Sequence, residues 1–142
     1  MVTESVLLVS TLSLIVELVV LGLLTLGYTL KRKKKFRQHG ITMTTALVLH
    51  LVTIFSWMIW SFRNFFSSAP VDFGNLIHLT ALAHATLGII AASLGVWLVA
   101  SWHLQTDVQK CFARKRIMLT TISLWLTAIL LGIVLYLAVV YS

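Results

Sequence analysis

The chain has 142 residues, of which 59% are hydrophobic and 11% are charged, and its formal net charge is +7. So much apolar sequence with so few charges excludes an ordinary soluble domain. The basic charge does not indicate nucleic acid, because it is confined to short segments that anionic lipid head groups would attract by roughly 1 kcal/mol per residue.

Four apolar runs follow one another along the chain, at residues 5–30, 41–62, 76–102 and 117–141. A bilayer core of about 30 Å requires roughly 20 helical residues, and each run reaches that length. The first run has no basic residues before it and a basic block after it, which is typical of a retained helix rather than a signal peptide. We therefore expect an all-α, four-helix transmembrane bundle that forms a single membrane domain over residues 1–142.

The basic residues predict the orientation of this bundle. Ten of the eleven Lys and Arg residues lie in segments 31–37 and 110–116, between the paired runs. Cytoplasmic loops retain such an excess of positive charge. We expect a multi-pass protein of the plasma membrane with both basic loops in the cytoplasm, both termini outside, and anionic lipid at its inner face. The single cysteine, Cys111, would stay reduced there.

The first run carries Glu17 near its centre, where a bare carboxylate is costly. With the expected orientation, Glu17 and His50 lie at similar depth. A hydrogen bond between them would orient the imidazole and raise its basicity as a ligand. Two alternatives remain open: a protonated carboxyl bonded to Ser13, and proton or cation exchange at Glu17.

The second run carries a stripe at heptad spacing that we expect to face the interior: His39, Met43, Ala46, His50, Thr53, Trp57 and Trp60. Aromatic residues at its outer end (Trp57, Trp60, Phe62, Phe65 and Phe66) are typical of a membrane interface.

The third run carries a stripe of small residues at spacings of four and three: Ala81, Ala85, Gly88, Ala92 and Gly95. Such a stripe allows a neighbouring helix, or a flat ring, to approach closely. Helix packing is the simpler interpretation.

The histidines are the main candidates for cofactor binding. Neutral imidazoles on facing helices can bind haem b iron above and below its ring. Two pairs are possible, His50 with His84 and His39 with His103. The first pair is the more deeply placed, with His50 about 2 Å inside the midplane and His84 about 7 Å outside it. A copper site is the alternative, since His39 and Met43 lie one turn apart and suit Cu(I).

Three stretches resemble the four-helix membrane proteins grouped as domain of unknown function 420: RQHGITMTTALVL (residues 37–49), ALAHATLGIIAASLGVWLV (81–99) and RKRIMLTTISLWLTAILLGIVLYL (114–137). The resemblance aligns the family's recurring residues with His39, His84, Trp125, Gly132 and Tyr136. It implies a role near haem-copper oxidases and a metal or haem site at His39 and His84. The chain departs from the family at Ser61 and Arg114, where further histidines are expected.

These observations favour a haem b protein that carries electrons within or beside a respiratory complex. The alternative is a non-catalytic assembly factor or accessory subunit of a membrane complex, binding partner helices or a second copy of itself. A small proton-coupled transporter using Glu17 is a third possibility. No hydrolytic triad, phosphate-binding loop or zinc motif is present, so nothing predicts an enzyme acting alone.

Overall fold

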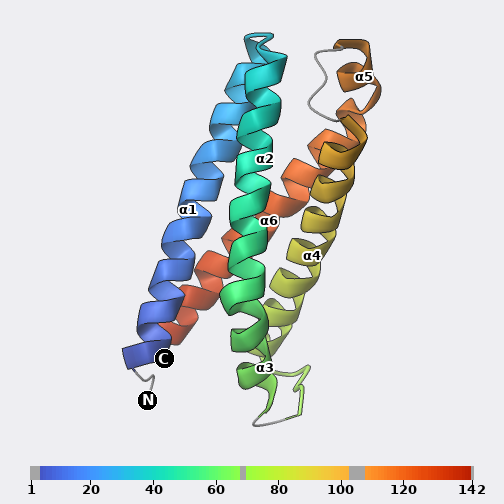
Figure 1. Ribbon diagram of the computed structural model, residues 1–142. Helices are drawn as coiled ribbons and strands as arrows, with labels where there is room; N and C mark the ends of the chain where they lie inside the picture. Colours follow the sequence, from blue (N-terminus) through green and yellow to red (C-terminus); the bar gives the residue numbers. More distant parts are fainter. Residues whose placement is uncertain (1–3, 68–69, 103–107, 142) are drawn as a thin grey trace.

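The computed structural model describes residues 4–67, 70–102 and 108–141, and every regular element in these ranges is a helix. Four long helical spans dominate (Figure 1): α1 (Glu4–Arg32), a span over Phe36–Ser67, α4 (Leu76–Trp102) and α6 (Lys115–Tyr141). Each is long and apolar enough to cross a membrane. The expected all-α architecture, with four helical spans long and apolar enough to cross a membrane, is confirmed.

The four spans are arranged as two helix pairs. α1 packs mainly along α2 (Phe36–Thr53), and α4 packs mainly along α6, whereas contacts between the pairs are sparser. The first turn of α1 and the last turn of α6 lie at one end of the bundle, together with α3 (Ile59–Ser67) (Figure 1). The turn between α1 and α2 lies at the opposite end, beside the short helix α5 (Val108–Ala113). Both basic segments therefore occupy the same end, as the expected topology requires.

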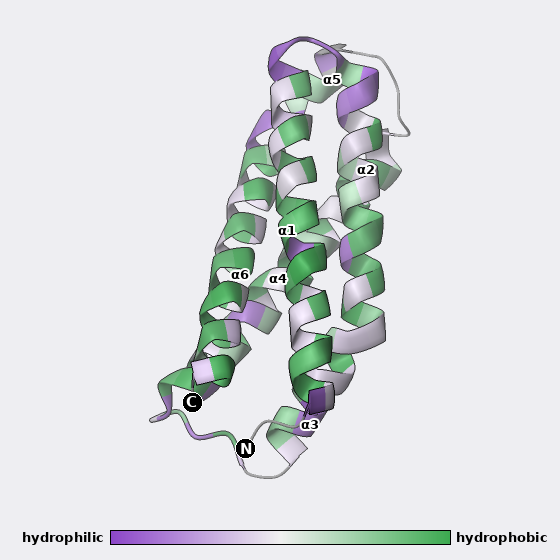
Figure 2. Ribbon diagram, turned by 90° about the vertical axis from the view of Figure 1, so that its left-hand side faces the viewer, coloured by the Kyte–Doolittle hydropathy of each residue, from purple (hydrophilic) through white to green (hydrophobic). Residues whose placement is uncertain are grey.

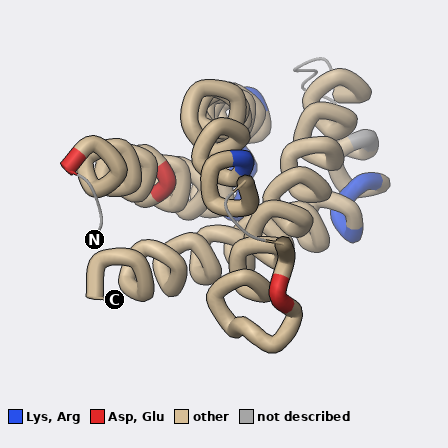
Figure 3. The backbone as a smooth tube through the Cα atoms, turned by 90° about the horizontal axis from the view of Figure 1, so that it is seen from below, with Lys and Arg blue, Asp and Glu red and all other residues tan. Residues whose placement is uncertain are grey.

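The surface of the bundle is apolar along most of its length. Figure 2 shows hydrophobic residues over the long helices and hydrophilic residues gathered near their ends. Charged residues occupy only a few short segments, so most of the backbone in Figure 3 is neutral. Large side chains such as Leu8, Val52, Ile89 and Leu130 are more than half exposed, which suits helices that face lipid.

A Schellman motif ends α1. The amide of Lys35 donates to the carbonyl of Leu30, and the amide of Lys34 donates to the carbonyl of Lys31, both at 3.0 Å. Lys34 has φ 59°, the left-handed conformation that this motif places after the helix. Because only three residues separate the two helices, the turn fixes the register of α1 against α2.

A π-helical turn, η1 (Ile54–Met58), interrupts the second span between α2 and α3. Thr53, at the end of α2, donates its hydroxyl to the carbonyl of Leu49 at 2.9 Å. The π turn explains why the predicted inward stripe ends here. Its members are buried or half-buried as far as Trp57, within the π turn, but Trp60 beyond it is 56% exposed because the wider turn rotates the later residues away from the core.

The chain enters α4 through a local network of hydrogen bonds. Asn75 caps the helix by accepting the amide of Ile77 at 2.9 Å, and Asp72 accepts the amide of Gly74 at 2.9 Å. His78 accepts the amide of Asp72 and packs against Phe65 and Phe66. The predicted aromatic cluster thus includes a histidine.

Arg114 joins the other ends of α4 and α6. Its guanidinium donates to the hydroxyl of Ser101 at 2.8 Å and lies 5.5 Å from the ring centre of Trp97. This arginine therefore has a structural role at the basic end of the bundle.

The stripe of small residues on α4 packs inside the chain itself. Ala81, Gly88, Ala92 and Gly95 are buried, and Ala85 is half-buried. A Cβ atom on Gly95 would lie 3.0 Å from a methyl group of Leu47, so α2 approaches closely there. A Cβ atom on Gly88 would meet nothing within 4 Å, so close packing does not extend along the whole stripe.

Candidate functional site

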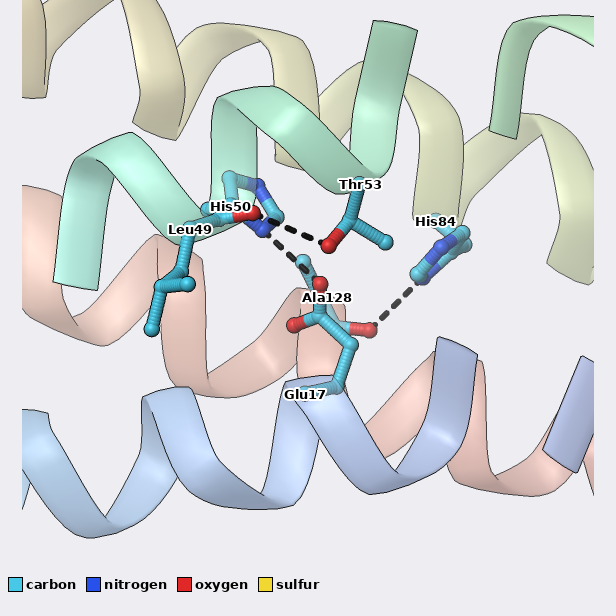
Figure 4. A network of polar contacts seen from close by, with 6 residues as sticks. All are labelled: Glu17, Leu49, His50, Thr53, His84 and Ala128. Carbon is cyan, nitrogen blue, oxygen red and sulfur yellow. Dashed lines mark hydrogen bonds and ion pairs between the residues drawn. The ribbon is translucent and has the colours of Figure 1, made fainter. Parts of the chain in front are cut away.

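The centre of the bundle contains a buried acid and imidazole pair. Glu17 on α1 is 6% exposed and His50 on α2 is 2% exposed, and Nδ1 of His50 lies 2.9 Å from Oε1 of Glu17 (Figure 4). The two residues meet because they lie almost equally far from the turn that joins their helices. The expected Glu17–His50 hydrogen bond is confirmed.

The second nitrogen of His50 has no hydrogen-bond partner in the part of the chain that the structure describes. Its Nε2 atom is buried, and the imidazole packs 4.9 Å from the ring of Trp125 on α6. When Nδ1 donates its proton to the carboxylate, Nε2 carries a lone pair that is free to accept a proton or bind a metal ion. An unsatisfied polar atom in a protein interior costs about 1–3 kcal/mol, so this orphaned nitrogen calls for a functional explanation.

His84 is held in a comparable way by the other helix pair. Its Nδ1 lies 2.7 Å from the carbonyl oxygen of Ala128 on α6. A carbonyl can only accept, so Nδ1 carries the proton in this bond. The imidazole also lies against Gly132, where a Cβ atom would come within 2.9 Å of Cε1. A glycine at this position leaves the space that the ring occupies.

His39 repeats the pattern near the basic end. Its Nδ1 lies 2.7 Å from the carbonyl oxygen of Gly27, and the side chain is 4% exposed. The ring of Trp102 packs beside it, with ring centres 6.4 Å apart, and covers Gly40, where any Cβ atom would overlap the indole. Its proposed partner, His103, lies outside the described residues. Met43 packs against Gly27 of α1.

The structure does not turn His50 and His84 toward each other. Figure 4 shows the imidazole of His50 directed at Glu17 on α1, and that of His84 directed at the backbone of α6. Within residues 4–67, 70–102 and 108–141, no three His, Cys, Asp or Glu side chains come together as a metal site would require.

The donor chemistry nevertheless fits haem iron. Histidines that bind metals almost always donate their other N–H to a carboxylate or a backbone carbonyl, which fixes the ring. His39, His50 and His84 all meet this condition through Nδ1. The buried, unpartnered Nε2 of His50 makes it the best prepared of the three.

Several features of the site had no signal in the sequence pattern alone. The hydroxyl oxygen of Tyr136 lies 3.1 Å from that of Thr11, and this hydrogen bond connects α6 to α1. Trp125 contacts His50 and, like Trp102, has a buried indole N–H that finds no hydrogen-bond partner among the described residues. Trp125, Gly132 and Tyr136 were singled out only through the family resemblance, and all three contact a neighbouring helix.

A narrow pocket of about 70 Å³ lies between the helix pairs at the basic end. His39, Trp102 and Trp125 line it, together with Lys31, but neither His50 nor His84 does. The central pair of Glu17 and His50 therefore lies outside this pocket, although Trp125 contacts His50 and also lines the pocket. Comparison of the chain with family models, curated proteins and solved structures found no match.

Proposed function

We propose that this protein is a membrane haem b protein that carries electrons within or beside a respiratory complex. The supporting observation is the imidazole of His50, which Glu17 orients through Nδ1 and which has a buried, unpartnered Nε2. Haem iron held by two imidazoles would supply one-electron transfer. His50 and His84 are the proposed ligands, and His39 with His103 is the second candidate pair.

In this proposal Glu17 acts as a positioning residue. By accepting the Nδ1 proton of His50, the carboxylate keeps the ring fixed and makes it a stronger electron donor to a metal. The carbonyl of Ala128 has the same role for His84. Because each ring is held by a different helix pair and the two rings do not face each other, haem binding would require both imidazoles to turn toward a space between the pairs.

An absorption spectrum of the detergent-purified protein, produced in haem-replete cells, tests the proposal. We expect a Soret band with sharp low-spin visible bands, and we expect His50→Ala or His84→Ala to abolish or alter them. His78→Ala is the matched control, because His78 lies in the first turn of α4 and contacts Phe65 and Phe66, away from the central pair. Glu17→Gln should raise the midpoint potential, since the ligand loses its carboxylate partner.

A colourless protein that also fails to bind added hemin would contradict the proposal. If His39→Ala loses the bands and His50→Ala retains them, the haem site lies at the basic end instead of the centre. A colourless chain that copurifies with other membrane subunits would favour the assembly or accessory role. We likewise propose that both basic loops lie in the cytoplasm.

A further inference from the structure

The pocket at the basic end follows the bundle axis for two helical turns on all four long helices. Its lining residues fall within 24–31 of α1, 39–47 of α2, 95–102 of α4 and 118–125 of α6. Each segment corresponds to a depth of about 10–12 Å at the rise of an α-helix. With a volume of only about 70 Å³, the pocket is deep and slender.

The chemistry of the lining changes along this depth. Leu24 and Leu47 are buried at the inner part, whereas Lys31 is partly exposed. Tyr28, which also lines the pocket, is 45% exposed, so the pocket opens along the side of α1 that carries Tyr28 and Lys31, near the basic turn. Trp102, the last residue of α4, also lines it and has a buried N–H for which the described residues offer no acceptor.

We propose that this pocket binds one acyl chain of an anionic amphiphile. The chain lies lengthwise in the apolar shaft, and its acidic head group remains at the rim. There Lys31 offers a positive charge that an acidic head group would neutralise, and Trp102 in the same lining has a buried N–H with no acceptor among the described residues. The neighbouring Arg32, Lys33 and Lys34 add to the attraction for an anion.

The shape of the pocket favours this ligand over a compact one. A cavity of about 150 Å³ is known to accommodate benzene, and this pocket has about half that volume. An acyl chain is narrow and can extend out of the opening, so it enters the pocket with less displacement of the helices than a compact ligand of the same size. The apolar lining also gives water few polar partners.

Tryptophan fluorescence can report binding directly, because bromine atoms quench an indole that they touch. The reporter protein retains Trp102 and Trp125 and carries phenylalanine in place of the three tryptophans outside the pocket: Trp57, Trp60 and Trp97. Dibromostearate added to this protein in dodecyl maltoside should quench its fluorescence saturably. A protein with only Trp60 retained measures the quenching that arises from the micelle alone.

Two matched substitutions on α4 locate the site. Val99→Phe fills the pocket and should abolish saturable quenching, whereas Val96→Phe lies on the exposed face of the same helix and should leave it unchanged. If Val99→Phe does not fold, Ile122→Phe on α6 fills the same space. Equal quenching in the filled and control variants, or quenching that never saturates, would overturn the proposal.

A second pair of variants tests the head group. Lys31→Gln should weaken the apparent affinity for dibromostearate about fivefold, while Lys33→Gln, outside the pocket, should change it little. The methyl ester of dibromostearate should bind as weakly to the unchanged protein as the acid does to Lys31→Gln. An ester that binds as well as the acid would overturn the role of Lys31.

The source of the chain is found by repeating the titration with a brominated phosphatidylglycerol. Saturable quenching by the free acid alone identifies a fatty acid site, and quenching by the phospholipid identifies a lipid of the inner leaflet. Absence of quenching by both would contradict the proposal. None of these measurements depends on haem.

Discussion

At the scale of single residues, the bundle uses backbone and side-chain acceptors to fix its imidazoles. Glu17, Gly27 and Ala128 each hold Nδ1 of a histidine within 2.9 Å. Only Glu17 uses a side chain, and its carboxyl group is 8% exposed. The free energy of unfolding should therefore depend on whether residue 17 still accepts a hydrogen bond from His50.

Replacing Glu17 tests this dependence. Glu17→Leu leaves both nitrogens of a buried imidazole unpartnered and should lower the free energy of unfolding by about 1–3 kcal/mol. Glu17→Gln keeps an acceptor oxygen at a similar distance from the backbone and should lower the free energy of unfolding by less than Glu17→Leu does. Chemical denaturation in mild detergent, followed by circular dichroism, measures both. An equal loss in the two variants would show that packing, and not the hydrogen bond, is what Glu17 provides.

The glycine beneath His84 offers a second test at this scale. Gly132→Ala places a methyl group 2.9 Å from Cε1 of the imidazole, so the ring must move away from Ala128. We expect a loss of about 1–3 kcal/mol, which is typical of overpacking. Gly22→Ala is the control, since a Cβ atom there meets nothing within 4 Å, and it should be neutral or stabilising. Equal thermal stability of the two variants would contradict the contact.

At the scale of the elements, the turn between α1 and α2 determines which residues meet. The Schellman motif at Lys34 closes α1, and α2 begins directly afterwards at Phe36. Residues at matching distances from the turn then lie at the same depth. The pairs Glu17 with His50 and Gly27 with His39 follow from this register.

Lys34 pays a conformational cost for its position in the motif. A left-handed residue other than glycine is disfavoured by roughly 1–2 kcal/mol. Lys34→Gly should therefore raise the free energy of unfolding by about 1 kcal/mol, while Lys33→Gly, which removes the same charge without a positive φ to relieve, should not. Denaturation of the two variants side by side gives the comparison, and a less stable Lys34→Gly would count against the assigned turn.

The sequence predicted some of these contacts and not others. Glu17 and His50 could be paired because the basic block marks the turn, and counting along two helices then gives their depth. The partner of His84 could not be predicted, because the carbonyl of Ala128 is a backbone group that every residue has. The π turn after Thr53 and the pocket at Lys31 were also missed, since both depend on how helices pack and not on a residue pattern.

At the scale of the whole molecule, the bundle has a basic end and an aromatic end. The turn after α1 and the segment before α6 supply the first, and α3 with the loop to α4 supplies the second. The excess of positive charge on cytoplasmic loops predicts which end faces the cytoplasm.

Cysteine labelling in intact cells tests this orientation. Ser67→Cys, at the end of α3, should react with a membrane-impermeant maleimide, and Lys33→Cys should react only after permeabilisation. Both are made in a Cys111→Ser background. In the unchanged protein, Cys111 should react slowly, because it is 2% exposed and burial raises the pKa of its thiol. Labelling of Lys33→Cys in sealed cells would reverse the topology.

The π turn has a consequence for how the second span tolerates changes in length. A π turn is equivalent to an α-helix that has gained one residue, so the extra residue is absorbed within Ile54–Met58 without disturbing α2. Deleting Phe55, which is 72% exposed, would let the span close into a continuous α-helix. Residues beyond the deletion would keep their present neighbours, because the residue lost is the extra one that the turn absorbs, and the imidazole of His50, about one turn earlier, would keep its place. The π turn thus uncouples the aromatic end of the span from the central pair, so that either can change without displacing the other.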